Sequence, residues 1–191
     1  MTTKHGIHQK SLSFTEREYA IQLLKNTQTK VFIATGGLNV TQTAFKTDTD
    51  KWSIEECVKH IAAAETILWA MAVASLKQAA NAEKRAGTVF TDEELINAVE
   101  DRSQKSTTIT ALEPTNSPYN TMADALASFK QNREKLIAFV KDTNDDLRNH
   151  VSVTPIGTYD AYQFILLISA HCNRHIQQIE DVKSAKDFPV R

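Results

Sequence analysis

Apolar residues recur at spacings of three and four along four segments of the chain, and this pattern predicts four long helices. We place them at residues 15–35, 53–84, 121–142 and 161–183. The spacing turns one apolar stripe of each helix toward a shared core. Glycine and proline are rare, at 5 and 4 of 191 residues, and strand-like alternation is scarce. The sequence therefore predicts an all-α fold in which the four segments pack as a four-helix bundle.

Capping signals mark where several of these helices begin. Thr15 and Glu18 predict a capping box at the start of the first helix, and Ser53 with Glu56 predicts another at the start of the second. Thr121 predicts the first turn of the third helix, because its hydroxyl can accept a hydrogen bond from an unpaired backbone N–H group. These signals agree with the limits that the apolar stripes indicate.

The connection between the second and third helices is long and polar. It contains one short helical pattern, at about residues 92–102, which Thr91 and Glu94 cap. We expect this crossover connection, residues 85–120, to lie across one end of the bundle. The stretch "VTPIGTYD" before the last helix is predicted to be a loop, because its proline and glycine interrupt the helical pattern.

Charge and composition narrow the class of function. Lys and Arg number 22 against 23 Asp and Glu, and no run of like charge offers a footprint for nucleic acid or an anionic membrane. The apolar stretches are shorter than the roughly 20 residues that span a bilayer, and the N-terminal stretch lacks the apolar core of a secretory signal. The two cysteines form no CxxC motif, which fits a reducing compartment. We expect one cytoplasmic domain over residues 1–191, with a small-molecule partner.

Three histidines form a candidate metal site. His171 and His175 are four residues apart, so they stack on one face of the last predicted helix, together with the apolar Ile168 and Ile179. His60 lies on the core-facing stripe of the second helix. Three inward imidazoles suit Zn²⁺ or Ni²⁺ and leave at least one coordination position open. The alternative is three ordinary buried histidines bonded to neighbouring groups; the third imidazole favours the metal.

The residues near these histidines leave two further alternatives. The HxxxH spacing is that of the HExxH zinc helices, but Cys172 stands where those enzymes carry their general base. Cys57 and Cys172 lie within one turn of His60 and His175, so a closed Cys/His zinc site is open, although we favour two small buried apolar residues. Glu56 is a candidate base or fourth ligand, and we place its capping role first. No catalytic residue is assigned.

Five other polar residues are predicted to face solvent. His5 and His8 lie in an N-terminal stretch without periodicity, and His150 lies in a polar stretch after the third helix. Glu65 and Arg133 occur inside otherwise core-facing helices. A buried ion pair or a bond to a metal ligand is the alternative for these two residues.

The stretches "WSIEECVKHIAAAE", "LEPTNSPYNTMADALASFKQNREKLIAFV" and "GTYDAYQFILLISAHCNRHIQQI" resemble the DinB-like superfamily of YfiT-type metalloenzymes, which is distinct from the translesion polymerase of that name. The resemblance covers most of the chain. It implies a four-helix bundle with one long crossover, a homodimer, and a divalent ion, zinc or nickel, on His60, His171 and His175.

Two classes of function follow. The resemblance implies an enzyme, either a hydrolase or an S-transferase that uses bacillithiol, mycothiol or glutathione. The sequence contains no Ser-His-Asp arrangement, phosphate-binding glycine loop or dinucleotide fingerprint, so any chemistry rests on the metal. A thiol has a lower pKa than water, so a metal-bound thiol can lose its proton without the glutamate base that zincins use. This favours thiol transfer over hydrolysis. The alternative is a non-catalytic, stress-related metal-binding or structural protein, in which the ion only joins two helices.

Overall fold

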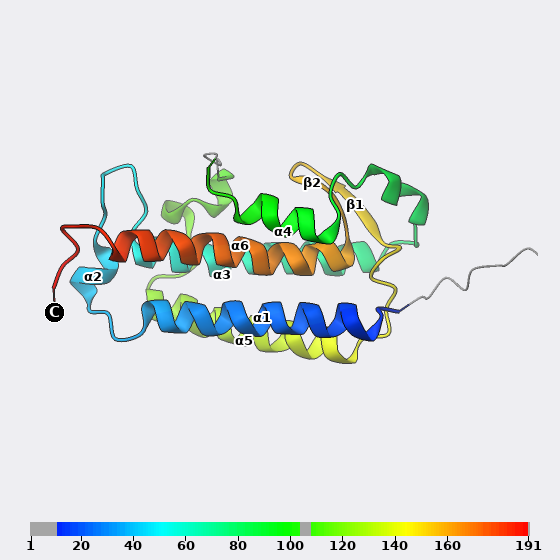
Figure 1. The fold of residues 1–191 in the computed structure, drawn as a ribbon, viewed down its shortest axis with the longest axis horizontal. Coiled ribbons are helices and arrows are strands. Elements are labelled where there is room, and N and C mark those ends of the chain that lie inside the picture. Colours follow the sequence, from blue (N-terminus) through cyan, green and yellow to red (C-terminus); the bar gives the residue numbers. More distant parts are fainter. Residues whose placement is uncertain (1–10, 104–107, 191) are drawn as a thin grey trace, which may run out of the picture.

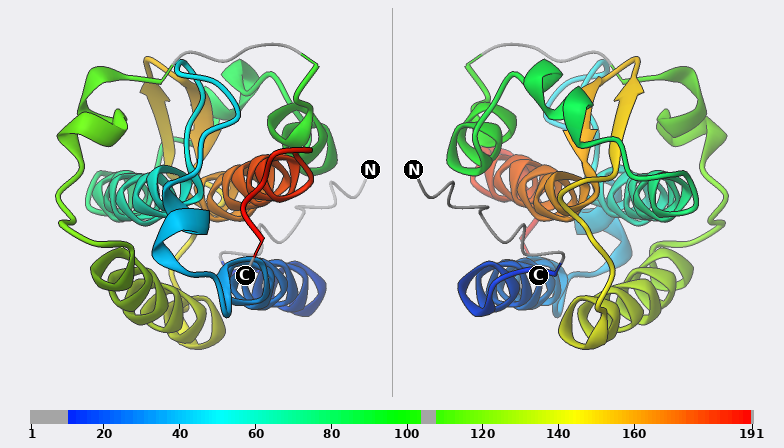
Figure 2. Two further views of the ribbon diagram at one scale, coloured as in Figure 1. Left: turned by 90° about the vertical axis from the view of Figure 1, so that its left-hand side faces the viewer. Right: turned by 90° about the vertical axis from the view of Figure 1, so that its right-hand side faces the viewer.

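A computed structural model describes residues 11–103 and 108–190, and within them four long helices form the bundle. They are α1 (Phe14–Thr35), α3 (Ile54–Leu76), α5 (Met122–Asp142) and α6 (Ala161–Lys183). Helices α3 and α6 lie side by side in one layer, and α1 and α5 form the other (Figure 1, Figure 2). The predicted four-helix bundle is confirmed.

Shorter elements connect the long helices. They are α2 (Val40–Ala44), α4 (Asp92–Glu100), the 3₁₀ turns η1 (Ala82–Gly87), η2 (Thr110–Leu112) and η3 (Pro114–Asn116), and the strands β1 (Val151–Thr154) and β2 (Gly157–Asp160). The predicted crossover is therefore a chain of short turns around one real helix, α4.

Helix α1 uses a different capping box from the predicted one. The Ser13 hydroxyl accepts a hydrogen bond from the Glu16 N–H group at 3.2 Å, and the Glu16 carboxylate accepts from the Ser13 N–H group at 2.8 Å. The overlapping Thr15 and Glu18 pair does not start the helix. Arg148 also donates to Glu16, at 2.7 and 2.9 Å. A tertiary contact thus supports the earlier of two locally possible boxes. Helices α3, α4 and α5 begin after the capping residues that the sequence indicated.

Helix α3 ends at Leu76 rather than near residue 84, so the predicted end was wrong. The cause lies in Asn81, whose backbone N–H group donates to the Asn149 carbonyl oxygen at 2.7 Å. The Asn81 side chain also bonds both the N–H and the carbonyl group of Val151, at 2.8 and 3.0 Å. These contacts hold the chain against the start of β1, out of the helical path.

The stretch predicted to be a loop before α6 is a β-hairpin. Strands β1 and β2 pair antiparallel, with Val151 opposite Asp160. Gly157 adopts a φ of +135°, a region that favours glycine, and so allows the tight return of the chain. Each strand has four residues, too few for an alternating pattern to outweigh the proline and glycine in the sequence.

The crossover runs along the side of the bundle rather than across one end, which corrects the expected position. Helix α4 lies against α6 over much of its length (Figure 1). Its Leu95 is buried, and Ile96 and Val99 pack against the same core cluster. The apolar face of α4 therefore needs the side of a long helix, which the end of a bundle does not offer.

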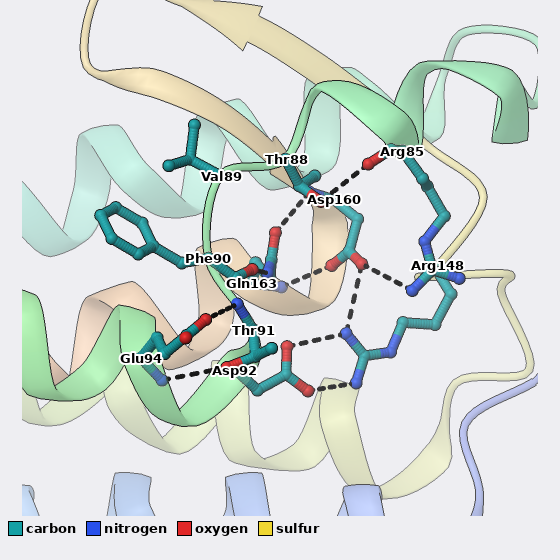
Figure 3. Close-up of a pocket in the computed structure, with 10 residues that line it drawn as sticks. All are labelled: Arg85, Thr88, Val89, Phe90, Thr91, Asp92, Glu94, Arg148, Asp160 and Gln163. Atoms are coloured by element: carbon teal, nitrogen blue, oxygen red, sulfur yellow. Dashed lines mark hydrogen bonds and ion pairs between the residues drawn. The ribbon is translucent and has the colours of Figure 1, made fainter.

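Arg148 connects the crossover to the bundle through hydrogen bonds and ion pairs. Its guanidinium donates to Asp92 at the start of α4 and to the buried Asp160, which caps α6 (Figure 3). It also donates to Glu16 of α1. It also lies 4.1 Å from the ring centroid of Tyr162. One cation thus joins three helices and neutralises a carboxylate that burial alone would disfavour.

Helix α3 is long and apolar enough, by length and composition, to cross a membrane, but core helices of helical bundles meet the same criteria. In this structure α3 packs against α5 and α6, and about half of its apolar length is buried within the fold. Its buried face contributes to the core and carries His60, one of the three candidate histidines.

Candidate metal centre

The structure brings the three candidate histidines together between α3 and α6. One ligand nitrogen from each of His60, His171 and His175 lies within 4.8 Å of the other two. The rings of His171 and His175 are 4.6 Å apart between centroids, as their spacing of one helical turn requires. His60 approaches from α3, with its Nε2 atom 3.2 Å from the Nε2 atom of His171.

Neighbouring groups determine which ring nitrogen of two histidines carries hydrogen. The Nδ1 atom of His60 lies 2.9 Å from the carbonyl oxygen of Leu112, in η2 of the crossover. A carbonyl oxygen only accepts, so Nδ1 is the donor and Nε2 keeps its lone pair. The Nδ1 atom of His175 lies 3.1 Å from the side-chain oxygen of Gln178, with the same consequence. Such outer contacts are typical of metal-binding imidazoles.

The electrostatic environment keeps the three imidazoles neutral. Burial lowers the pKa of all three; it lowers the pKa of His171 to about 3, helped by the neighbouring His60. His60 and His175 are 4% and 8% exposed. Metal ions bind the unprotonated form of imidazole, so the cluster is ready to coordinate at neutral pH without first losing protons.

Trp52 covers the cluster. Its ring stacks on His175, with an angle of 11° between the planes, and lies 4.8 Å from the ring of His60 between centroids. The residue directly precedes Ser53, the cap of α3. The roles of Trp52, Gln178 and the Leu112 carbonyl were all missed. Gln178, one turn after His175, was the one local signal available.

The alternatives for nearby cysteines and Glu56 are resolved. Within the residues that the structure describes, the cluster contains histidine ligands alone. Cys57 is buried among apolar side chains, whereas Cys172 lies beside the buried Arg133. Burial raises the pKa of the Cys172 thiol to about 11. Glu56 accepts from the Ser53 N–H group at 2.8 Å and pairs with Lys46. It is therefore a capping residue, as expected.

Glu65 and Arg133 do not face solvent, so that expectation was wrong. Arg133 is fully buried and Glu65 is 3% exposed, and the guanidinium donates to the carboxylate at 2.6, 3.0 and 3.2 Å. Arg133 also donates to the Thr27 hydroxyl and to the Leu24 carbonyl oxygen. The buried ion pair, weighed as the alternative, is what the structure contains, because both side chains start from core-facing positions.

His150 is also not solvated as predicted. It is half-buried, and its Nδ1 atom lies 3.1 Å from the Ser75 carbonyl oxygen, apart from the three-histidine cluster. His5 and His8 lie outside the described residues.

The chemistry of the donor set, and the spacing of two of its nitrogens, fit a transition-metal ion. Two nitrogens at 2.0–2.1 Å from a tetrahedral ion are about 3.3 Å apart, close to the 3.2 Å between His60 and His171. Without a cation, two nitrogen lone pairs would face each other here unless His171 donates a hydrogen. Three neutral nitrogen donors also leave a coordination position for a small molecule. The cluster could therefore hold a metal ion.

Comparison with known proteins agrees with this description. The sequence model of the DinB superfamily matches residues 23–179. A solved structure, that of YfiT from Bacillus subtilis, is similar in fold, with a TM-score of 0.61 over 96% of this chain and 91% of that chain, at 14% identity. YfiT is described as "a probable metal-dependent hydrolase with an unusual four-helix bundle topology". No curated protein matches this chain significantly.

Proposed function

This chain belongs to the DinB superfamily, and we propose that it is a metal-dependent enzyme whose ion is held by His60, His171 and His175. The observation that carries the proposal is the convergence of three neutral imidazoles, two of them buried and that of His171 half-buried, on one point. Zn²⁺ or Ni²⁺ suits such ligands better than Mg²⁺ or Ca²⁺. When bound, the ion would lower the pKa of water or of a thiol and so supply a nucleophile near neutral pH.

The protein's own contribution is to hold the ligands in place and to limit water. The Leu112 carbonyl oxygen and Gln178 orient two of the rings, and Trp52 packs on both. Because Leu112 belongs to the crossover, the position of that connection controls the ring of His60. A substrate that shifted the crossover would also shift this ligand.

Two reactions on a small electrophilic molecule are candidates. The description of YfiT favours hydrolysis. The make-up of the cluster favours transfer of a low-molecular-weight thiol, because no carboxylate joins it within the described residues and Glu56 is engaged in capping. A thiol, with a pKa near 8.5, needs no such base once it coordinates. We further propose a cytoplasmic homodimer. We also propose that it binds neither nucleic acid nor an anionic membrane, which the net charge of −1 supports.

Elemental analysis tests the metal site. Protein purified without a nickel affinity step is expected to hold about one transition-metal ion per chain. The triple variant His60→Ala, His171→Ala, His175→Ala is expected to lose it. His150→Ala, which removes an imidazole outside the cluster, is the matched control and keeps the ion. Equal metal content in the triple variant and the wild type would show that the site is elsewhere.

Activity assays separate the two reactions. Generic esters and amides are compared with conjugation of an electrophile to several cellular thiols, using metal-loaded protein, chelated protein and His171→Ala. Metal-dependent turnover with a thiol supports transfer, and metal-dependent turnover with water alone supports hydrolysis. Rates that respond neither to chelation nor to the substitution would favour the non-catalytic, structural alternative.

A further inference from the structure

A pocket lies along α6 on the side of the helix away from the histidine cluster. It has a volume of about 300 Å³ and lies where α1 and α4 both flank α6, an arrangement visible in Figure 2. Ser169 and Asn173 of α6 line it. Each is two residues from His171, about 200° around the helix, so they face the opposite side. The pocket is thus separate from the candidate metal centre.

Ser169 is the feature that points to a ligand. The residue lines this pocket and is only 2% exposed. Among the described residues, its hydroxyl is the buried side-chain oxygen that lacks a hydrogen-bond partner. Buried hydroxyl groups are nearly always satisfied, and a serine in a helix usually bonds a carbonyl oxygen of the preceding turn. A polar atom of a bound molecule would supply the missing partner.

Charged groups of opposite sign stand at the rim. Lys30 of α1 is exposed, and its ammonium group donates to the Asn173 side-chain oxygen at 3.1 Å. Glu100 of α4 lines the same pocket, and in the part of the chain that the structure describes its carboxylate forms no ion pair. Lys30 and Glu100 therefore face one space without neutralising each other. That arrangement complements a molecule that carries both a carboxylate and an ammonium group.

The remaining walls are mixed and the space is small. Leu23, Ile96 and Ala170 supply carbon surface, and Asn26, Thr27 and Thr29 of α1 supply polar groups. At roughly 30 Å³ for each water, the pocket holds about ten water volumes, at the lower end of ligand sites. This size suits a molecule as small as a single amino acid.

The other large pocket lacks these features. It measures about 420 Å³ and lies beside Arg148, Asp92 and Asp160 (Figure 3). Its charged groups already bond one another, as Arg148 donates to both carboxylates. A ligand there would have to break existing ion pairs, whereas a ligand beside Ser169 would complete an unsatisfied set.

We propose that the pocket between α1, α4 and α6 binds a small zwitterion of the free amino-acid class. Its carboxylate meets Lys30, its ammonium group meets Glu100, and a polar atom at the end of its side chain accepts or donates a hydrogen bond at the Ser169 hydroxyl. The site goes beyond the proposed metal-dependent activity and does not require it.

L-Glutamine is the first probe, followed by analogues that each lack one group. Glutaramate lacks the ammonium group, γ-aminobutyramide lacks the carboxylate, and L-norleucine lacks the side-chain amide. Binding is measured by titration calorimetry and by amide chemical shifts in chelated protein and in His171→Ala, so that a failure of the metal hypothesis leaves the result intact. Glutamine is expected to bind with a Kd of about 1 mM or lower, and each analogue about tenfold more weakly.

Variants assign the contacts. Lys30→Gln and Ser169→Ala are each expected to weaken glutamine binding about fivefold to tenfold. Arg85→Gln, in the other pocket, is the matched control and leaves binding unchanged. Ser169→Ala is expected to fold with an unchanged circular-dichroism spectrum, because its hydroxyl has no partner to lose. No binding of the probe at about 10 mM, or binding that neither variant weakens, overturns the proposal.

Discussion

Two clusters of polar side chains in the bundle, the Arg133–Glu65 pair and the three histidines, differ in how their polar atoms are satisfied. Arg133 and Glu65 carry full charges, and each finds its partner inside the protein. The three histidines are neutral, and the ring nitrogens of His60 and His171 face each other at 3.2 Å. The first group is complete without any ligand. The second is arranged around a point that a cation would satisfy.

From this difference we expect the two polar clusters to have different roles. A self-neutralising pair such as Arg133 and Glu65 holds α3 to α5, and its loss is a loss of packing. A cluster that turns its lone pairs inward depends on something from outside, and its loss is a loss of binding. Variants in the two clusters should therefore separate stability from metal affinity.

The largest expected effect is on the ion pair. Arg133→Met leaves the Glu65 carboxylate buried without a partner, and we expect the free energy of unfolding to fall by about 3–5 kcal/mol. Urea unfolding at pH 7 measures it. The double variant Arg133→Met, Glu65→Leu removes both charges and should regain most of the loss. A single variant within about 1 kcal/mol of the wild type would mean that the pair contributes little.

The second-largest expected effect on stability is that of removing the metal. An ion at 100 to 1,000 times its Kd stabilises the folded state by about 2.7–4.1 kcal/mol. Thermal unfolding with and without a chelator should show this difference in the wild type, and no difference in the triple histidine variant. Arg133→Met should keep the metal-dependent shift, because its cluster is separate. A chelator effect of equal size in the triple variant would contradict the site assignment.

A smaller effect is expected from Gln178, which touches the cluster through the Nδ1 atom of His175. Gln178→Leu is expected to lower metal affinity by about 10–100-fold, while the stability of chelated protein changes little. Competition with a coloured chelator measures the affinity. Gln177→Leu, at the adjacent position, is the matched control and should retain wild-type affinity. Equal affinities in both variants would remove Gln178 from the site.

The smallest effect is the dependence of stability on pH in chelated protein. The pKa of His171 is about 3 when folded and about 6.5 when unfolded, so the unfolded chain binds more protons between these values. The contribution of His171 is therefore fully present above about pH 6.5 and is lost progressively as the pH falls toward 3. We expect about 1–2 kcal/mol of loss from pH 7 to pH 5, measured by urea titration. The triple histidine variant should show a flatter profile.

Local periodicity determined the helices and the candidate histidines. A spacing of four residues places His171 and His175 on one face whatever the rest of the chain does, and the apolar neighbours of His60 show which side is inward. The bundle follows from the same stripes, because each apolar face needs a partner. These features depend on residues within one or two helical turns, so the sequence alone could predict them.

Tertiary contacts determined the end of α3, the orientation of His60 and the burial of Arg133. The end of α3 depends on Asn81 meeting Asn149 and Val151, and the orientation of His60 depends on the Leu112 carbonyl. A backbone oxygen carries no signal in the identity of its residue, and partners some fifty or more positions apart leave no local pattern. The buried state of Arg133 was equally hidden, because a charged residue stays inside only when the folded chain delivers a carboxylate to it.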